Sequence, residues 1–166
     1  FGKVSGTIRN LRVENTTLNV AVGPDVPYDS NRYSGKIHAG ILAGALTETG
    51  TIENCQITGC SASFTIAPPT GNMTVNSSVI LGGVVGMLKG KMNGVACLDT
   101  SVNASSSATV LNLTYNDKVP RYYQEGSLMA GGLAGVIAGS SAVMSNSGYM
   151  VSSKDFAGNI TAEGID

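Results

Sequence analysis

Charged residues are scarce in this sequence. Asp, Glu, Lys and Arg make up 13% of the 166 residues, against about 25% in an average soluble protein. Ten basic residues stand against eleven acidic ones, and neither sign forms a clustered run. Because such a chain offers no basic track for a phosphate backbone, nucleic acid is not an expected partner.

Other residue types and patterns are also missing. The chain contains no Trp, a single His and three Cys. Cys55, Cys60 and Cys97 lack the spacing of a metal site, so we expect no metal and no cofactor, and we predict buried thiols. No apolar run approaches the roughly 20 residues of a membrane-spanning helix, so no membrane insertion is expected. No charged and apolar leader opens the sequence; we expect either that a leader has been removed or that the chain is a piece of something longer.

Glycine, hydroxyl groups and apolar side chains are abundant instead. The sequence has 22 Gly and 32 Ser and Thr, and 42% of its residues are apolar. A chain of this length and composition can bury a core of its own. We therefore expect a single domain, residues 1–166, with a neutral, hydroxyl-rich surface.

A glycine-rich step occurs three times. It reads Gly40-Ile-Leu-Ala-Gly44, then Gly82-Gly-Val-Val-Gly86, then Gly131-Gly-Leu-Ala-Gly135. Each Gly inside a helix costs about 1 kcal/mol relative to Ala. In strands, Gly instead permits a sharp corner or a close approach of neighbouring backbone. The steps therefore predict corners in a β-structure.

A strand-like block follows each step and also opens the chain, at residues 6–13, 50–57, 90–97 and 142–149. Its apolar positions follow mostly a two-residue period, which indicates strand. Short strands repeated at a fixed period predict an all-β chain, a right-handed parallel β-solenoid (β-helix) of about four coils with three protruding loops. The units are expected near residues 1–39, 40–81, 82–130 and 131–166. The first lacks its glycine step, and the whole is expected to be a segment of a longer repeat protein.

Asn10, Asn54 and Asn146 occupy the same position in three of these blocks. Successive coils of a β-solenoid lie about 4.8 Å apart, so aligned amides could hydrogen-bond along the stack. The alternative is a row of ligand-binding amides. Cys55 and Cys97 fall at positions expected to point inward, which argues against a catalytic thiol.

The glycine step followed by Ile52-Glu-Asn-Cys55 resembles the GLUG motif. That repeat occurs in large bacterial surface and secreted proteins, including adhesin-like proteins. The third copy has Gly94 in place of the Asn, and the third and fourth have Val95 and Ser147 in place of the Cys. The resemblance implies an extracellular β-solenoid in a modular protein and supplies no catalytic residue.

Three segments interrupt the repeat: residues 21–36, 67–78 and 114–126. They hold all five Pro and five of the six Tyr, and since each precedes a glycine step we expect them to emerge from the same side. Tyr beside Asp and Arg suits either a glycan or a protein partner. The other interpretation is that the Tyr side chains cover the coil edges. The candidate binding residues are Tyr28, Arg32, Tyr33, Tyr115, Asp117, Arg121, Tyr122 and Tyr123.

These observations favour a non-enzymatic structural or adhesive module of an extracellular or cell-surface protein or filament. Its expected partners are host or matrix glycans, glycoproteins, or neighbouring copies stacked end to end. One alternative is a carbohydrate-active β-helix enzyme, a polysaccharide lyase or hydrolase, using Asp25, Asp29 and Asp117. Another is an ice- or mineral-binding face, for which the Thr row at Thr7 and Thr51 is broken at Lys91.

Six N-glycosylation sequons are present. In a eukaryotic secreted protein they could carry glycans, and in a bacterium they would indicate only a polar surface. Both interpretations stay open. The sequons are Asn15, Asn72, Asn76, Asn103, Asn112 and Asn159.

Overall fold

The computed structural model describes residues 1–22, 33–66, 75–106, 113–115, 119–121, 128–151 and 160–163. Within these residues every regular element is a β-strand, which confirms the predicted all-β class. The strands form four groups along the chain, here called passes. The passes comprise residues 1–22, residues 33–66, residues 75–106, and residues 128–151 with 160–163.

The first pass has four strands, and each later pass has five. The first contains β1 (Lys3–Val4), β2 (Thr7–Arg9), β3 (Arg12–Glu14) and β4 (Thr17–Val22). The second contains β5 (Tyr33–Gly40), β6 (Ala43–Leu46), β7 (Thr51–Glu53), β8 (Gln56–Thr58) and β9 (Ser61–Ile66). The third contains β10 (Val75–Gly82), β11 (Val85–Leu88), β12 (Lys91–Asn93), β13 (Ala96–Leu98) and β14 (Ser101–Ser106). The fourth contains β17 (Leu128–Gly131), β18 (Ala134–Ile137), β19 (Val143–Ser145), β20 (Gly148–Met150) and β21 (Ile160–Glu163).

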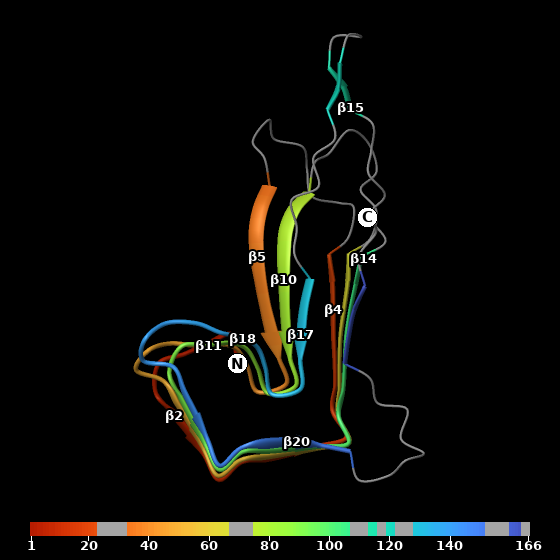
Figure 1. The fold of residues 1–166 in the computed structure, drawn as a ribbon. Coiled ribbons are helices and arrows are strands. Elements are labelled where there is room, and N and C mark those ends of the chain that lie inside the picture. Colours follow the sequence, from red (N-terminus) through yellow and green to blue (C-terminus); the bar gives the residue numbers. More distant parts are fainter. Residues whose placement is uncertain are drawn as a thin grey trace.

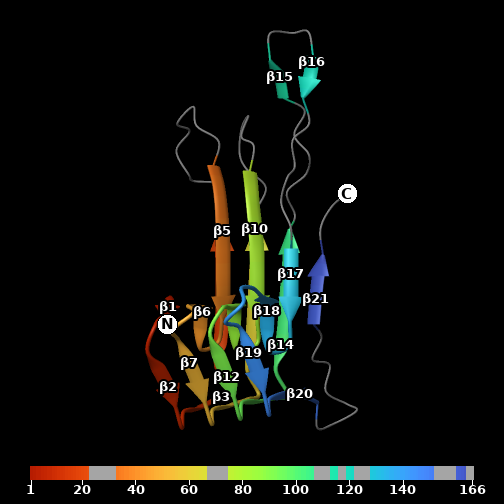
Figure 2. The same cartoon turned by 60° about the vertical axis from the view of Figure 1, so that its left-hand side comes forward.

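Each strand pairs in parallel with its counterpart in the next pass. Five sheets result, and their strands lie side by side in the order of the passes (Figures 1 and 2). Register partners, one from each pass, form what we call a row; Ile8, Ile52, Met92 and Met144 are one such row. The sheets are β1-β6-β11-β18, β17-β10-β5, β19-β12-β7-β2, β20-β13-β8-β3 and β21-β14-β9-β4.

Two clusters of buried side chains fill the space between the sheets. The larger joins Leu46, Ile52 and Ile57 of the second pass to Leu88 and Met92 of the third. The smaller is built around Phe64, with Val79, Leu81 and Val102. Short strands such as β7 and β13 bury their middle residue only, because alternate side chains of a strand point to opposite faces.

The strands extend further than the sequence indicated. Tyr33 and Val75 were expected in loops, yet they open β5 and β10 and are register partners. Strands β5 and β10 pair along eight positions, so the polar residues of these two segments are register partners of one another. The segments expected to be loops therefore do not lead directly into the glycine steps; a strand separates each from its step.

The third expected loop also contains strand. Strands β15 (Leu113–Tyr115) and β16 (Val119–Arg121) form an antiparallel pair, which Figure 2 shows beyond the ends of β5 and β10. Pro120 lies in β16 opposite Thr114. A proline is tolerated there because a two-stranded hairpin consists of edge strands only.

Candidate functional site

The predicted Tyr-rich surface lies largely outside the described residues. This holds for Tyr28, Arg32, Asp117, Tyr122 and Tyr123. Of the others, Tyr33 begins β5, while Tyr115 and Arg121 belong to the hairpin of β15 and β16. The binding role of all eight residues stays a prediction.

The strand ends that flank these segments share one side of the molecule. Val22 and Ile66 end β4 and β9 at the same level, and Tyr33 and Val75 begin β5 and β10 at the same level. In Figure 2 the starts of β5 and β10 point to the same side. These strand ends therefore lie on one edge of the stack.

The glycine steps form corners with no room for a side chain. A Cβ at Gly82 would lie 2.0 Å from the Val85 carbonyl oxygen, and a Cβ at Gly131 would lie 2.0 Å from the Ala134 carbonyl oxygen. At the other end of the step, a Cβ at Gly86 would lie 2.6 Å from the backbone nitrogen of Ala39. The predicted corners are confirmed, and both flanking glycines are required because backbone approaches each of them.

The first pass contains part of a glycine step, contrary to expectation. Lys3 is the register partner of Ala45, so Gly2 lies level with Gly44. The Gly44 N–H and the Ala45 N–H donate to the carbonyls of Phe1 and Gly2. This position was missed because one glycine without its partner gives no motif.

Each of the predicted Asn positions is a corner with a left-handed backbone. The φ angles of Asn10, Asn54 and Asn146 are 56°, 50° and 48°, and Gly94, which replaces Asn in the third pass, has φ 65°. The bond that repeats along the stack here is made by backbone: the Asn54 N–H donates to the Asn93 carbonyl at 3.0 Å. Asn recurs because, after Gly, it adopts this conformation most readily. One of these side-chain amides does bond along the stack, since Asn146 Nδ2 donates to Asn93 Oδ1 at 3.0 Å. Asn93 lies in another row, so bonds between aligned amides are not the reason why Asn recurs.

A second corner of the same kind was missed by sequence reasoning. Asn15 lies between β3 and β4, Gly59 between β8 and β9, and Asp99 between β13 and β14. Their φ angles are 50°, 62° and 47°. Their N–H groups donate to the next pass, as Gly59 does to the Leu98 carbonyl at 3.0 Å. The available signal was that Asn, Gly and Asp are the residues that enter the left-handed region.

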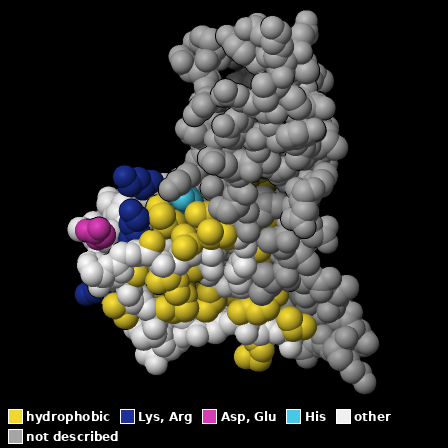
Figure 3. Space-filling view, turned by 45° about the horizontal axis from the view of Figure 1, so that its top comes forward, with side chains coloured by type: hydrophobic (Ala, Val, Ile, Leu, Met, Phe, Trp, Pro, Cys, Tyr) yellow, Lys and Arg dark blue, Asp and Glu magenta, His cyan; other side chains and the backbone are white. Residues whose placement is uncertain are grey.

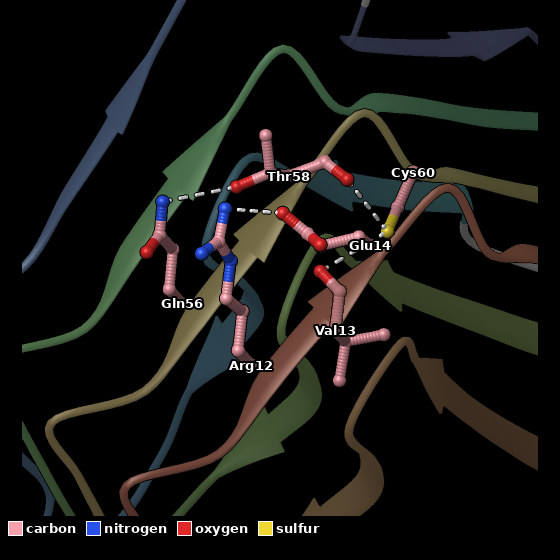
Figure 4. A network of polar contacts seen from close by, with 6 residues as sticks. All are labelled: Arg12, Val13, Glu14, Gln56, Thr58 and Cys60. Atoms are coloured by element: carbon pink, nitrogen blue, oxygen red, sulfur yellow. Dashed lines mark hydrogen bonds and ion pairs between the residues drawn. The ribbon is translucent and has the colours of Figure 1, made fainter.

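A hydroxyl or thiol follows the corner residue in five cases and bonds back to the carbonyl two residues earlier. Cys55 donates to the Glu53 carbonyl at 3.2 Å, and Cys60 donates to the Thr58 carbonyl at 3.3 Å. Figure 4 shows the second of these bonds beside the outward pair of Arg12 and Glu14. The same bond is made by Thr16, Thr100 and Ser147. All three thiols are buried, which confirms the prediction, and Cys55 and Cys60 have a structural role at the corners.

The third thiol, Cys97, belongs to β13 of the third pass and lies in the core. Its register partners are Ile57 of the second pass and Tyr149 of the fourth. Burial raises the pKa of the Cys97 thiol from 9.0 to about 11, which a hydrogen bond with Thr100 partly offsets. Burial also raises the pKa of Tyr149, whose hydroxyl donates to the Thr100 carbonyl at 2.6 Å. Cys97 is therefore protonated near neutral pH, and a protonated thiol is a poor nucleophile.

The outer face of β4, β9 and β14 is polar and uncharged. Ser61 donates to the Thr17 hydroxyl at 3.1 Å, and Ser63 donates to the Asn19 Oδ1 at 2.6 Å. The described side chains on this face are Thr17, Asn19, Ser61, Ser63, Thr65, Ser101 and Asn103. On β2, β7, β12 and β19, by contrast, Thr7 and Thr51 share a row with Lys91 and Val143, so the expected break in the Thr row is confirmed.

Two of the six sequons have described side chains. Asn15 is exposed at the second corner, and Asn103 is exposed on the outer face of β14. Asn76 lies in β10, not in the loop where it was expected. Asn72, Asn112 and Asn159 lie outside the described residues.

The two ends of the stack expose residues that are buried in the middle passes. Leu46 and Leu88 are fully buried, whereas Ile137 in the same row is 55% exposed. At the opposite end Leu11 is 36% exposed, although Cys55, level with it in the second pass, is 2% exposed. Figure 3 shows hydrophobic side chains gathered on the face turned to the viewer, with basic and acidic side chains to one side. Both ends of the stack therefore expose apolar side chains.

Among the described residues no three His, Cys, Asp or Glu side chains lie close enough together to hold a metal ion. The candidate catalytic residues Asp25, Asp29 and Asp117 lie outside them. Nor does any described residue belong to a helix long and apolar enough to cross a membrane.

Comparison of the chain with models of protein families, with curated proteins and with solved structures found no match. The site must therefore be interpreted from its own geometry.

Proposed function

We propose that this chain is a non-enzymatic structural and adhesive module: a right-handed β-solenoid of about four coils, with three loops on one side, from an extracellular or cell-surface protein of the GLUG type. The observation that carries the proposal is the register. In four of the five sheets the rows run through all four passes, and two left-handed corners recur at the same levels. A unit that repeats in this way builds a rod whose length follows the number of repeats.

The rod interpretation agrees with how the chain distributes its polar groups. Backbone groups at the corners bond to neighbouring passes, and the outward rows of β4, β9 and β14 consist of small polar residues. The three thiols lie at the corners or in the core. Such a construction suits a spacer that displays a surface, and the loop-bearing edge is the surface that we propose binds glycans or glycoproteins.

One measurement distinguishes a binding module from an enzyme. The purified chain is incubated with a panel of polysaccharides and matrix glycoproteins, and both retention on the ligand and shortening of the ligand are scored. Retention without shortening is the expected result for an adhesive module. Shortening would overturn the proposal in favour of the enzyme, and absence of retention would reduce the module to a spacer.

The loop residues give a sharper version of this test. We expect the double variant Tyr122→Ala, Tyr123→Ala to abolish retention while the melting temperature stays within about 2 °C, as for surface substitutions of less than 0.5 kcal/mol. Phe64→Ala, which empties a buried site, is the contrasting control that should lower stability. Unfolding of the Tyr double variant would instead favour the interpretation in which these side chains cover the coil edges.

A further inference from the structure

The backbone ladder at the corners runs in both directions between adjacent passes. The corner residue donates to the following pass, as the Gly94 N–H does to the Ser145 carbonyl at 3.2 Å. The residue two positions later donates to the preceding pass, as the Ala96 N–H does to the Cys55 carbonyl at 3.0 Å. Each pass therefore offers the next one a donor and an acceptor at a fixed spacing.

The backbone groups that form these two bonds between adjacent passes are also present at the two ends of the stack. At the fourth-pass end the equivalent groups are the Asn146 N–H and the Ser147 carbonyl. At the first-pass end they are the Arg9 carbonyl and the Arg12 N–H, since Arg9 and Arg12 are the register partners of Glu53 and Gln56. The corner conformation also matches, with φ of 48° at Asn146 and 56° at Asn10.

We propose that a second copy of this chain stacks its first-pass end on the fourth-pass end, head to tail. The Asn146 N–H then donates to the Arg9 carbonyl of the neighbouring copy, and the Arg12 N–H of that copy donates to the Ser147 carbonyl. This contact repeats the one that already joins the first pass to the second, the second to the third and the third to the fourth. The inference deepens the proposed function by naming one partner of the module, and it rests on the solenoid interpretation.

Charge sets the polarity of this contact. The first pass carries Lys3, Arg9 and Arg12 with one acidic residue, Glu14. In the fourth pass residues 128–151 contain no charged residue, and β21 adds one acidic residue, Glu163. Two first-pass ends face to face would bring like charges together, which is destabilising. Head-to-tail stacking avoids this, because Arg9 falls level with Ser145 of the neighbouring copy.

The same stacking also covers the apolar residues at both ends. Rows that end at Ile137, Met144 and Tyr149 in one copy continue at Val4, Ile8 and Val13 in the next. Because all six side chains are apolar or aromatic, the core would continue across the contact without a buried charge.

The first experiment blocks one end at a time. Ile137→Lys places a charge on the fourth-pass end, and Leu11→Lys places one on the first-pass end. Thr65→Lys, on an exposed site of the second pass, is the matched control. Mass is measured by analytical ultracentrifugation as a function of concentration. We expect assembly of the unmodified chain and of Thr65→Lys, monomers for each blocked variant alone, and a one-to-one dimer when the two blocked variants are mixed.

Two results would overturn the proposal. A mixture of the blocked variants that stays monomeric excludes head-to-tail contact, and Leu11→Lys that still dimerises alone indicates contact between two fourth-pass ends. If the unmodified chain stays monomeric and still retains a glycan, the stacking inference is wrong and the proposed adhesive function is supported. If the chain assembles but retains no ligand, the stacking inference is supported and the adhesive role is wrong.

A cross-linking measurement keeps the test decisive even if a Lys variant fails to fold. In the proposed contact Thr7 lies level with Val143 of the neighbouring copy, as it does with Thr51 within the chain. Level residues on parallel strands lie about 4.8 Å apart, within the range of a disulfide. A chain with Thr7→Cys and a chain with Val143→Cys should therefore form a covalent dimer on mild oxidation, whereas Thr17→Cys with Val143→Cys should not. Equal yields for the two pairs would refute the register.

Discussion

Asn54 allows the corner interpretation to be tested directly. Its backbone is left-handed, with φ 50°, and its side chain is exposed. The left-handed conformation costs an ordinary residue about 1–2 kcal/mol, which Gly avoids and Asn reduces. We therefore expect Asn54→Ala to lower the free energy of unfolding by about 1 kcal/mol, and Asn54→Gly to change it by less than about 0.5 kcal/mol.

The measurement is urea unfolding followed by circular dichroism. The urea concentration at the midpoint should fall while the slope m stays constant. In a thermal melt, about 1 kcal/mol corresponds to a fall of about 2–4 °C in melting temperature for a chain of this size. Thr65→Ala, at an exposed strand position, is the control and should be nearly neutral. If Asn54→Gly were as destabilising as Asn54→Ala, the side-chain amide would be the stabilising group and the corner argument would be refuted.

Three further predictions concern the core and the other corners. Gly82→Ala places a Cβ 2.0 Å from a backbone carbonyl oxygen and should lower the free energy of unfolding by about 1–3 kcal/mol, whereas Gly148→Ala, with nothing within 4 Å of its Cβ, should be nearly neutral in the same thermal melt. Burial raises the pKa of Cys97 from 9.0 to about 11, so between these pH values the folded chain keeps a proton that the unfolded chain releases. The free energy of unfolding should therefore fall as the pH rises from 9.0 to about 11, and it should fall less in Cys97→Ala. Tyr149→Phe removes a 2.6 Å hydrogen bond and should lower the free energy of unfolding by about 1 kcal/mol in urea.

The parallel repeat could be predicted from the sequence because its determinants are local. Gly40, Gly82 and Gly131 are register partners, and they recur because backbone approaches them too closely for any side chain. The alternation around Ile52 and Ile57 has the same kind of local cause, since only one face of a short strand is buried.

Other features depend on neighbours that the local sequence does not reveal. The segment from Tyr33 to Lys36 contains no apolar alternation, and it becomes strand because β10 supplies a partner for each residue. The second corner has a different residue type in each pass, namely Asn15, Gly59 and Asp99, and all three have a left-handed backbone. Because the residue type changes, the repeat cannot be recognised from matching residues in the sequence. The Tyr-rich loops have no repeated pattern from which a structure could be argued.

The direction of the ladder has a mechanical consequence. Hydrogen bonds between passes run along the stacking direction, and the first and fourth passes each have a neighbouring pass on one side only. A terminal pass that is pulled away therefore detaches by breaking the bonds of one interface, whereas a middle pass is held by two. Force should then peel the rod one pass at a time, and each step of about 40 residues would release about 140 Å of extended chain. A molecule that lengthens stepwise dissipates energy before any covalent bond is strained, and the middle passes, which hold the core, would yield last.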